Sequence, residues 1–214
     1  MNLHDWLRYI ESTHPTSIDL TLDRIKTVVE RLHLNFSFPI ITVGGTNGKG
    51  STCAMLESIY KAAGYKVGCY TSPHFLHFNE RIKVNAIPVS DEIICEAFSK
   101  IEAARKDISL TYFEYGTIAA MIIFANADLD VAILEVGLGG RLDAVNVFDS
   151  DCAIVTTIDL DHMDYLGHTR EAIGFEKAGI YRSHKTAICG DFDPPRSEEH
   201  TSELQSPCNL VCRL

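Results

Sequence analysis

Long apolar runs, paired cysteines and an excess of positive charge are all missing from this chain of 214 residues. The longest apolar run, 118–125, is far shorter than the ~20 residues that a helix needs to cross a bilayer. The seven cysteines include no Cys-x-x-Cys pair. Scattered cysteines of this kind are typical of a protein in a reducing compartment, where they act as small apolar residues. Residues 1–10 lack a basic segment followed by an apolar core, so we expect no signal peptide. These absences predict a soluble, cytoplasmic protein.

The formal net charge is −10 at pH 7, so nonspecific binding to nucleic acid or to an anionic membrane is not expected. An acidic chain can still bind an anionic nucleotide where a local loop and a metal ion supply a positive field. The hydrophobic share of 46% and the charged share of 22% are ordinary for a globular protein. We expect a monomer whose partners are small molecules.

Short apolar runs rich in β-branched residues alternate with segments of helical periodicity. The predicted strands are 39–43, 66–70, 130–136, 152–157 and 186–189, and the predicted helices are 3–10, 22–32, 49–63, 91–106, 112–127 and 171–178. This alternation predicts an α/β fold with a doubly wound, mostly parallel sheet. Ligands of such a sheet gather at the C-terminal ends of its strands.

A glycine-rich loop, 44–52, follows the first predicted strand and leads into a helix. Its sequence is Gly-Gly-Thr-Asn-Gly-Lys-Gly-Ser-Thr, in which successive backbone N–H groups can point inward and form an anion site. Lys49 would reach the β- and γ-phosphates of a nucleotide, and Ser51 or Thr52 could offer a hydroxyl to Mg²⁺. The predicted nucleotide-binding residues are Gly45, Thr46, Asn47, Gly48, Lys49, Gly50, Ser51 and Thr52.

The loop departs from the strict pattern G-x-x-x-x-G-K-[ST], because Val43 holds the first glycine position and Gly50 follows the lysine. A flexible structural turn is therefore the alternative interpretation. The form Gly-Thr-Asn-Gly-Lys-Gly-Ser resembles the loop of ATP-dependent amide ligases of the Mur type rather than that of switch GTPases.

Six further segments resemble those of the bacterial dihydrofolate synthases/folylpolyglutamate synthases of the Mur ligase family. They are 70–74, 78–82, 111–115, 135–146, 161–167 and 176–182. With the loop, they extend the resemblance from residue 1 to about residue 193. The resemblance implies a central Mur ligase domain with a phosphate loop. It also implies an ATP-dependent ligase that adds L-glutamate to dihydropteroate and to tetrahydrofolate.

The same resemblance implies that Ser72, Glu135 and His162 hold the metal ion against the nucleotide phosphates. Glu135 and His162 both follow predicted strands, so both should reach the ligand-binding edge of the sheet. Hydroxyl, carboxylate and imidazole groups suit Mg²⁺, which typically keeps several waters and phosphate oxygens. Taken alone, such a glutamate would more often be a salt-bridge partner, and such a histidine a satisfied polar residue.

Lys177 resembles the lysine that these ligases carbamylate, where the added carboxylate would help to position a metal ion. An ordinary salt bridge at a helix end is the alternative. The predicted catalytic residues are Lys49, His162 and Lys177.

Two segments match those that hold the pterin substrate in the family. They comprise Thr16, Ser17, Ile18, Asp19, Thr111, Tyr112 and Phe113. Phe113 could stack on a pterin ring, although an aromatic residue on an apolar helix is usually part of the core. Arg81 and Arg141 are candidate carboxylate or phosphate partners, because a guanidinium group binds both bidentately, but either could equally be a surface charge. Phe175 departs from the family, in which a basic residue is commoner at that position.

In the implied reaction the substrate carboxylate attacks the γ-phosphate of ATP, and the amino group of glutamate then displaces phosphate from the acyl phosphate. The family has a second, C-terminal α/β domain that the sequence does not encode. We therefore expect an ATP-binding domain at 1–195 with little or no ligase activity by itself. One alternative is a Mur-type ligase for a peptidoglycan precursor, which 111–113 and 138–143 argue against. The other is a non-catalytic phosphate-loop module, whose guanine-reading Asn-Lys-x-Asp motif is missing.

The segment 196–214 shows no apolar periodicity. Back-translated, 196–206 fits a common sequencing-library adapter. Our hypothesis is that 196–214 is a non-native, disordered tail, and a natural polar tail is the alternative. Independent resequencing of the locus distinguishes the two.

Overall fold

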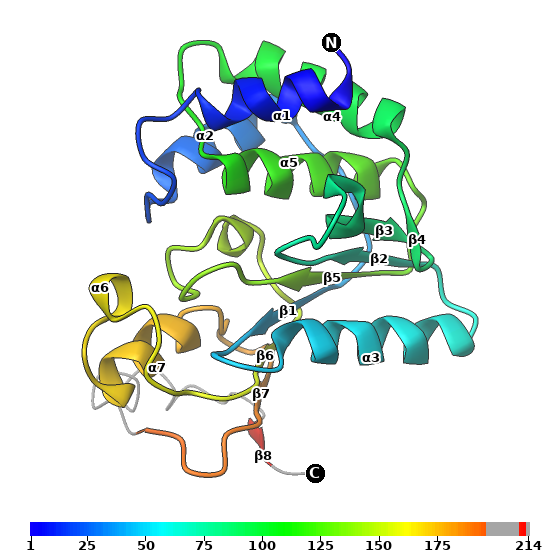
Figure 1. Cartoon of the computed structure of the whole chain (residues 1–214). Helices are drawn as coiled ribbons and strands as arrows, with labels where there is room; N and C mark the ends of the chain where they lie inside the picture. Colours follow the sequence, from blue (N-terminus) through cyan, green and yellow to red (C-terminus); the bar gives the residue numbers. More distant parts are fainter. Residues whose placement is uncertain (196–209, 213–214) are drawn as a thin grey trace.

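One eight-stranded sheet forms the centre of the molecule within residues 1–195 and 210–212, which the computed structural model of the chain describes (Figure 1). The strand order is β4-β3-β2-β5-β1-β6-β7-β8. The strands are β1 (Ile40–Gly44), β2 (Val67–Tyr70), β3 (Ile82–Val84), β4 (Ile87–Pro88), β5 (Val131–Glu135), β6 (Cys152–Val155), β7 (Thr186–Cys189) and β8 (Leu210–Cys212). Neighbouring strands are parallel except in the pairs β2–β3 and β3–β4. The predicted mostly parallel α/β fold is confirmed.

Helices cover both faces of this sheet (Figure 1). They are α1 (Leu3–Glu11), α2 (Asp23–Leu32), α3 (Lys49–Ala62), α4 (Asp91–Arg105), α5 (Tyr112–Ala125), α6 (Met163–Leu166) and α7 (Arg170–Ala178), with 3₁₀ turns η1 (Phe78–Arg81) and η2 (Ala144–Val147). On one face α5 lies next to the sheet, with α1, α2 and α4 outside it, and α3 packs against β1, β2 and β5 on the other. No helix of the described residues is long and apolar enough to cross a membrane.

The helix α5 is enclosed by the sheet and by its neighbouring helices, which explains why its sequence is apolar on every side. All residues from 114 to 124 are buried. The helix begins with a capping box, in which Thr111 Oγ1 accepts the Glu114 N–H at 3.2 Å and Glu114 Oε2 accepts the Thr111 N–H at 2.7 Å. This buried cap fixes the start of α5 at the edge where β1 and β5 end.

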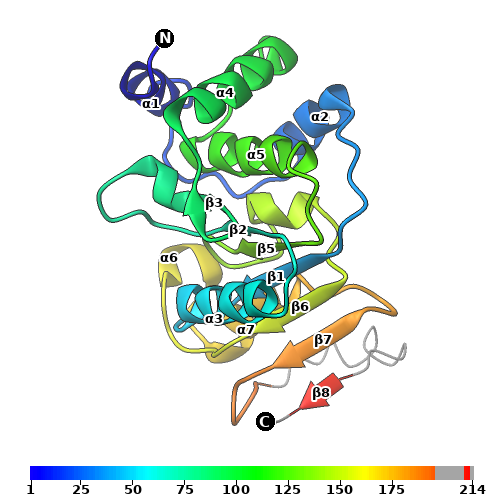
Figure 2. The same ribbon diagram turned by 90° about the vertical axis from the view of Figure 1, so that its right-hand side faces the viewer.

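Three short strands were not predicted. The strands β3 and β4 have three and two residues, too few for an alternating pattern to show in the sequence. At the other edge β8 pairs in parallel with β7 (Figure 2), so the prediction of disorder does not hold for 210–212. The unpaired backbone groups of an edge strand such as β7 accept any extended segment that reaches them. Residues 196–209 and 213–214 lie outside the described residues, and their origin stays a prediction.

Candidate functional site

The glycine-rich loop connects the C-terminal end of β1 to the first turn of α3. Gly48 is the N-cap of α3 and has φ +83°, and Gly45 has φ +140°. A Cβ atom on Gly45 would lie 1.9 Å from Thr156 Oγ1. Lys49 Nζ donates to the carbonyl oxygens of Gly45 at 2.9 Å and Thr46 at 3.1 Å. The loop therefore has the geometry of an anion cradle, in which glycine is required by both backbone conformation and space.

Two threonines that follow β6 hold the loop in place. The Thr46 N–H donates to the Thr157 carbonyl at 2.8 Å, and the Asn47 N–H donates to Thr157 Oγ1 at 3.1 Å. Thr156 Oγ1 donates to the Asn47 carbonyl at 2.7 Å. No sequence motif predicts these two supports, because they reach the loop through the neighbouring position of β1 and β6 in the sheet.

The two hydroxyl groups considered for Mg²⁺ differ in their surroundings. Thr52 Oγ1 donates to the Gly48 carbonyl at 2.9 Å, so this hydroxyl is already engaged. Ser51 lines a cavity of about 510 Å³ together with Ser72 and Glu135. The geometry therefore favours Ser51 as the hydroxyl that faces a ligand.

Glu135 lies at the junction of the loop and the residue Ser72. Its side chain is buried, with Oε2 accepting the Ser72 N–H at 2.9 Å. A Cβ atom on Gly50 would lie 3.6 Å from Glu135 Oε1, so the carboxylate faces the first turn of α3. Burial raises the pKa of Glu135, while the Ser72 N–H and the charges of Lys49 and Arg81 oppose that shift. Hydroxyl and carboxylate oxygens around one cavity fit a hard divalent cation.

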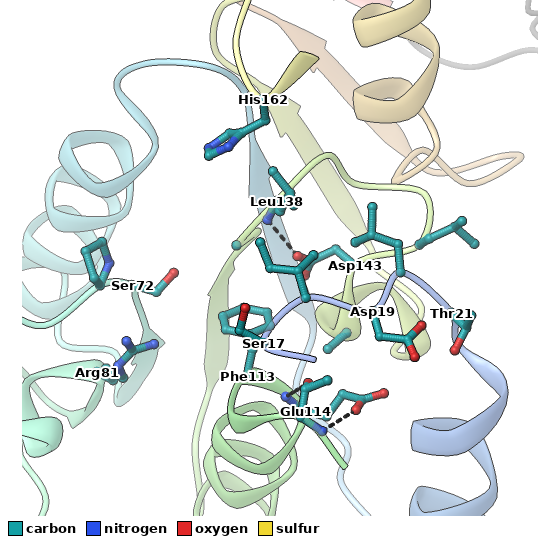
Figure 3. A pocket seen from close by; sticks show the side chains of 17 residues that line it. Ser17, Asp19, Thr21, Ser72, Arg81, Phe113, Glu114, Leu138, Asp143 and His162 are labelled. Atoms are coloured by element: carbon teal, nitrogen blue, oxygen red, sulfur yellow. Dashed lines mark hydrogen bonds between the residues drawn. The ribbon is translucent and has the colours of Figure 1, made fainter. Parts of the chain in front are cut away.

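His162, the third predicted metal ligand, lies on a different cavity from Glu135. Its side chain is 52% exposed, and its Nε2 lies 3.6 Å from an Asp161 carboxylate oxygen. It lines a second cavity, together with Ser72 but not with Glu135 (Figure 3). The described residues contain no group of three or more His, Cys, Asp and Glu side chains that could hold a metal ion. The structure thus joins Ser72 to Glu135 and leaves His162 on a neighbouring wall.

The second cavity has a volume of about 300 Å³ and a mainly apolar lining (Figure 3). Of the predicted substrate residues, Ser17, Ile18, Asp19, Thr111 and Phe113 line it, whereas Thr16 and Tyr112 do not. Ser72 and Pro73 line both this cavity and the one beside the phosphate loop. Three of the predicted nucleotide residues, Gly48, Gly50 and Ser51, and five of the predicted substrate residues therefore lie on two cavities that share a wall.

Tyr112 faces away from the cavity and supports Arg81, which lines it. The Arg81 guanidinium lies 5.6 Å from the ring centre of Tyr112 and 5.7 Å from that of Phe78. Arg81 Nε donates to His74 Nδ1 at 2.8 Å. Arg81 is buried, so its charge is held in the cavity wall by aromatic faces rather than exposed at the surface.

Phe113 both packs and lines the cavity, so the two interpretations of this residue are compatible. Its ring lies 5.8 Å from that of Tyr70 at an interplanar angle of 36°. A Cβ atom on Gly137 would lie 2.7 Å from Phe113 Cζ. One face of the Phe113 ring therefore lies flat against Gly137 in the loop after β5, and this contact fixes the position of the ring.

Two acidic residues of the cavity, Asp143 and Glu114, were not predicted as site residues. Asp143 accepts the N–H groups of Leu138 at 2.8 Å and Val145 at 3.1 Å. Burial raises the pKa of Asp143 to about 7, and burial also raises the pKa of Glu114. Both residues cap the start of a helix, so their sequence context indicates a structural role. Only the fold reveals that they also line the cavity.

Lys177 is buried in α7, with 3% of its surface exposed. Burial and, to a lesser extent, the positive charge of Lys49 lower its pKa to about 8, while Asp161 opposes the shift. No described residue forms a salt bridge or hydrogen bond with its Nζ, so the ordinary salt bridge considered from the sequence is not formed within that part of the chain.

Arg141, the second candidate anion partner, lines neither cavity. It pairs with Glu176 at 2.9 Å, and its guanidinium lies 5.5 Å from the ring centre of Phe175. The aromatic residue that departs from the family therefore packs beside an arginine.

Comparison with known proteins agrees with this geometry. The Mur ligase middle domain matches residues 43–209. The dihydrofolate synthase/folylpolyglutamate synthase of Escherichia coli (strain K12) is 55% identical over 194 residues, which are 90% of this chain and 46% of that protein. The corresponding protein of Haemophilus influenzae is 51% identical over 196 residues, which are 91% of this chain and 45% of that protein. The chain spans about half the length of the curated relatives it matches.

Solved structures give the same result. The structure of E. coli FolC in complex with DHPP and ADP has a TM-score of 0.95 and 50% identity, and the match covers 100% of this chain and 51% of that one. A bifunctional folylpolyglutamate synthase/dihydrofolate synthase with Mn, AMPPNP and L-glutamate bound has a TM-score of 0.91 and 49% identity, with 100% and 52% covered. The chain belongs to the Mur ligase family, as a middle domain similar to that of dihydrofolate synthase/folylpolyglutamate synthase.

Proposed function

We propose that this chain is the nucleotide-binding part of an ATP-dependent ligase that adds L-glutamate to dihydropteroate and to tetrahydrofolate. The observation that carries the proposal is the shared wall at Ser72 and Pro73 between the cavity of the phosphate loop and the apolar second cavity. Such an arrangement brings a phosphoryl donor and a carboxylate acceptor together. The relatives bound to ADP with DHPP, and to AMPPNP with L-glutamate, support this assignment.

The nucleotide phosphates would bind at the N-terminus of α3, where the loop ends and the first helical N–H groups have no partner within the helix. Lys49 would move from the loop carbonyls to the phosphates. Ser51, Ser72 and Glu135 would hold Mg²⁺, with His162 near by on the adjoining wall. When bound, Mg²⁺ supplies positive charge that offsets the charge of the phosphoryl oxygens.

The second cavity would hold the pterin. The face of Phe113 offers a stacking surface, and the carboxylates of Asp19 and Asp143 can accept hydrogen bonds from ring N–H groups. Arg81, held in the wall that includes Ser72, would attract the substrate carboxylate toward the phosphate loop.

In the reaction a carboxylate oxygen of the substrate bonds to the γ-phosphorus of ATP, and ADP leaves. The glutamate amine then bonds to the acyl carbon, the C–O bond to phosphate breaks, and the amine loses a proton. The residues of this chain contribute by holding the carboxylate next to the phosphates and by balancing negative charge, which are the two main sources of catalysis in phosphoryl transfer.

Lys177 would react with CO₂ to form a carbamate. Its amine nitrogen bonds to the carbon of CO₂ and releases a proton, which requires the neutral amine. Burial and a pKa of about 8 supply more neutral amine than an exposed lysine has. Carbon-13 NMR of the chain in ¹³C-bicarbonate would show a carbamate signal that Lys177→Met lacks, and equal spectra would contradict the assignment.

For the whole protein we propose a cytoplasmic monomer that binds ATP, L-glutamate and a pterin or reduced folate, and no nucleic acid. We expect the chain by itself to show little or no ligation, because it spans about half the length of its relatives. Glutamate incorporation at a normal ligase rate by the chain alone would contradict this expectation.

The proposal is tested by measuring the binding of dihydropteroate and of MgADP to the 214-residue chain by calorimetry. We expect both to bind. A nucleotide-linked sugar acid should fail to compete with dihydropteroate, since a peptidoglycan-type ligase would prefer it, and GDP should fail to replace ADP. Competition by the sugar acid, or binding of a nucleotide without any dihydropteroate site, would favour the alternatives.

A further inference from the structure

The segment between α1 and α2, which forms one wall of the second cavity, is held against the start of α5 by two partly buried side chains. His14 Nδ1 lies 3.0 Å from Ser109 Oγ, and its Nε2 lies 3.2 Å from Asp19 Oδ2. Thr13 Oγ1 donates to the Leu110 carbonyl at 3.0 Å. The segment has no helix or strand of its own between residues 12 and 22, so these side chains determine its position.

Arg24, in the first turn of α2, connects the same two walls. Its Nη1 donates to Asp19 Oδ2 at 2.8 Å, and its Nη2 lies 3.3 Å from both the Asp19 carbonyl and Glu114 Oε1. The side chain is 20% exposed and that of Glu114 is 3% exposed. Only a planar, forked cation can reach two carboxylates and a carbonyl at once in this way.

The connection continues from Glu114 to the first turn of α5. The second carboxylate oxygen of Glu114 accepts the Thr111 N–H at 2.7 Å. Asp19, Thr111 and Glu114 all line the cavity, whereas Arg24 and His14 do not. Arg24 and His14 therefore lie behind the cavity wall, in contact with residues that face into it.

Asp19 is the residue on which both connections converge. His14 and Arg24 share its Oδ2, and no described group of the protein donates to its Oδ1. Since Asp19 lines the cavity, Oδ1 remains available to accept a hydrogen bond from a ligand. Figure 3 shows Asp19 at the wall of the cavity opposite to Ser72.

We propose that Arg24, assisted by His14, is a positioning residue for the heterocyclic substrate. It holds the wall of residues 17–21 against the start of α5 and turns Asp19 so that Oδ1 accepts an N–H of the bound ring. This inference rests on the proposed function, because the ligand it requires is a fused heteroaromatic ring with N–H donors, such as that of dihydropteroate.

The test is a double-mutant cycle of Arg24→Lys and Asp19→Asn, read as the Kd of dihydropteroate and of ADP for the 214-residue chain. Lysine keeps the positive charge but cannot bond to Asp19 and Glu114 together. We expect each single variant to weaken dihydropteroate binding about tenfold and to leave the Kd of ADP within about twofold. In the Asp19→Asn background, Arg24→Lys should raise the Kd of dihydropteroate by less than about a further twofold, because Arg24 acts through Asp19.

Hydrogen exchange provides a readout that needs no ligand. In Arg24→Lys the amides of 16–21 should exchange faster, while those of the phosphate loop should not change. The matched control is Arg105→Lys. Arg105 donates to Glu102 at 2.6 Å and to Tyr9 at 2.7 Å in a comparable network that lines neither cavity. This variant should leave both dissociation constants unchanged.

The outcomes separate the two proposals. A wild-type chain that binds no dihydropteroate contradicts the proposed function and this inference with it. A wild-type chain that binds it, with Arg24→Lys binding equally well or with the two substitutions additive, overturns the inference alone. Equal losses of ADP and dihydropteroate affinity in Arg24→Lys would indicate general damage to the fold and would also overturn it.

Discussion

The phosphate loop and the second cavity are built in opposite ways. The loop is one continuous segment, 44–52, whose proposed binding groups are backbone N–H groups and a single lysine. The cavity is assembled from side chains of several segments, including 17–21, 72–73, 111–114 and 137–144. The two regions meet at Ser72 and Pro73.

This difference predicts how each region responds to substitution. A site made of backbone groups depends on glycine conformation and tolerates little added volume. A site made of side chains from distant segments depends on the packing that brings those segments together. Substitutions in one region should therefore change the affinity for one ligand and leave the affinity for the other unchanged.

The largest effect is expected for Gly45→Ala in the loop. The new Cβ atom would lie 1.9 Å from Thr156 Oγ1, at a backbone φ of +140° that L-residues rarely adopt. We expect the free energy of unfolding to fall by about 3 kcal/mol and ADP binding to be lost. Gly64→Ala is the matched control, since Gly64 has φ +89° with open space around its Cβ position, and should cost about 1 kcal/mol. Equal losses would show that space at Gly45 is unimportant.

The next largest effect is expected for Lys177→Met, which removes the buried lysine of α7 and should change how stability depends on pH. The ordinary pKa of Lys177, 10.5, is lowered to about 8 in the folded chain by burial. Between these values the unfolded chain binds more protons, so the contribution of Lys177 to stability increases as pH rises from about 8 to about 10.5. In CO₂-free buffer, Lys177→Met should be more stable than the wild type by up to about 3 kcal/mol at pH 7. Denaturant unfolding should show this difference vanish near pH 10.5, and a difference independent of pH would contradict the lowered pKa of the buried Lys177 amine.

Lys49→Met should weaken ligand binding at the phosphate loop but not in the second cavity, and it should cost less stability than Gly45→Ala. Among the residues that the structure describes, Lys49 Nζ bonds only to two loop carbonyls, so we expect a change in melting temperature of no more than about 2 °C. The affinity for ADP should fall by about thirtyfold, because a charge-assisted contact to phosphate is lost. Dihydropteroate binding should stay within about twofold, and a parallel loss of both affinities would show that the regions are not independent.

The smallest effect is expected for Gly137→Ala on the cavity side. The added Cβ atom would meet the Phe113 ring at 2.7 Å and move it toward the cavity. We expect dihydropteroate affinity to fall by about fivefold, which corresponds to about 1 kcal/mol, with ADP affinity unchanged. Unchanged dihydropteroate affinity in Gly137→Ala would mean that the Phe113 ring does not form the binding surface.

The same contrast explains how much the sequence predicts. The parallel sheet, the buried helix α5 and the loop are predictable because each is encoded by a local pattern: apolar runs, uniform apolarity and closely spaced glycines. The segments with Ser17 and Asp19, and with Thr111 and Phe113, came from a family resemblance, and the fold brings them together.

What the sequence alone does not give are contacts between distant segments. Thr156 and Thr157 support the loop only because β6 lies beside β1, and Asp143 and Glu114 occur in ordinary capping patterns. Tyr112, between two cavity residues, points away because successive residues of a helix lie about 100° apart. The predicted metal trio remains a prediction, with Ser72 hydrogen-bonded to Glu135 and lining the second cavity together with His162.

The most direct test is to titrate one preparation of the chain with dihydropteroate and MgADP, separately and together, and to repeat both titrations with Lys49→Met and Gly137→Ala. We expect both ligands to bind at once, Lys49→Met to weaken the binding of MgADP alone, and Gly137→Ala to weaken the binding of dihydropteroate alone. Mutual exclusion of the two ligands, or loss of both affinities in either variant, would contradict two adjoining cavities with separate ligands.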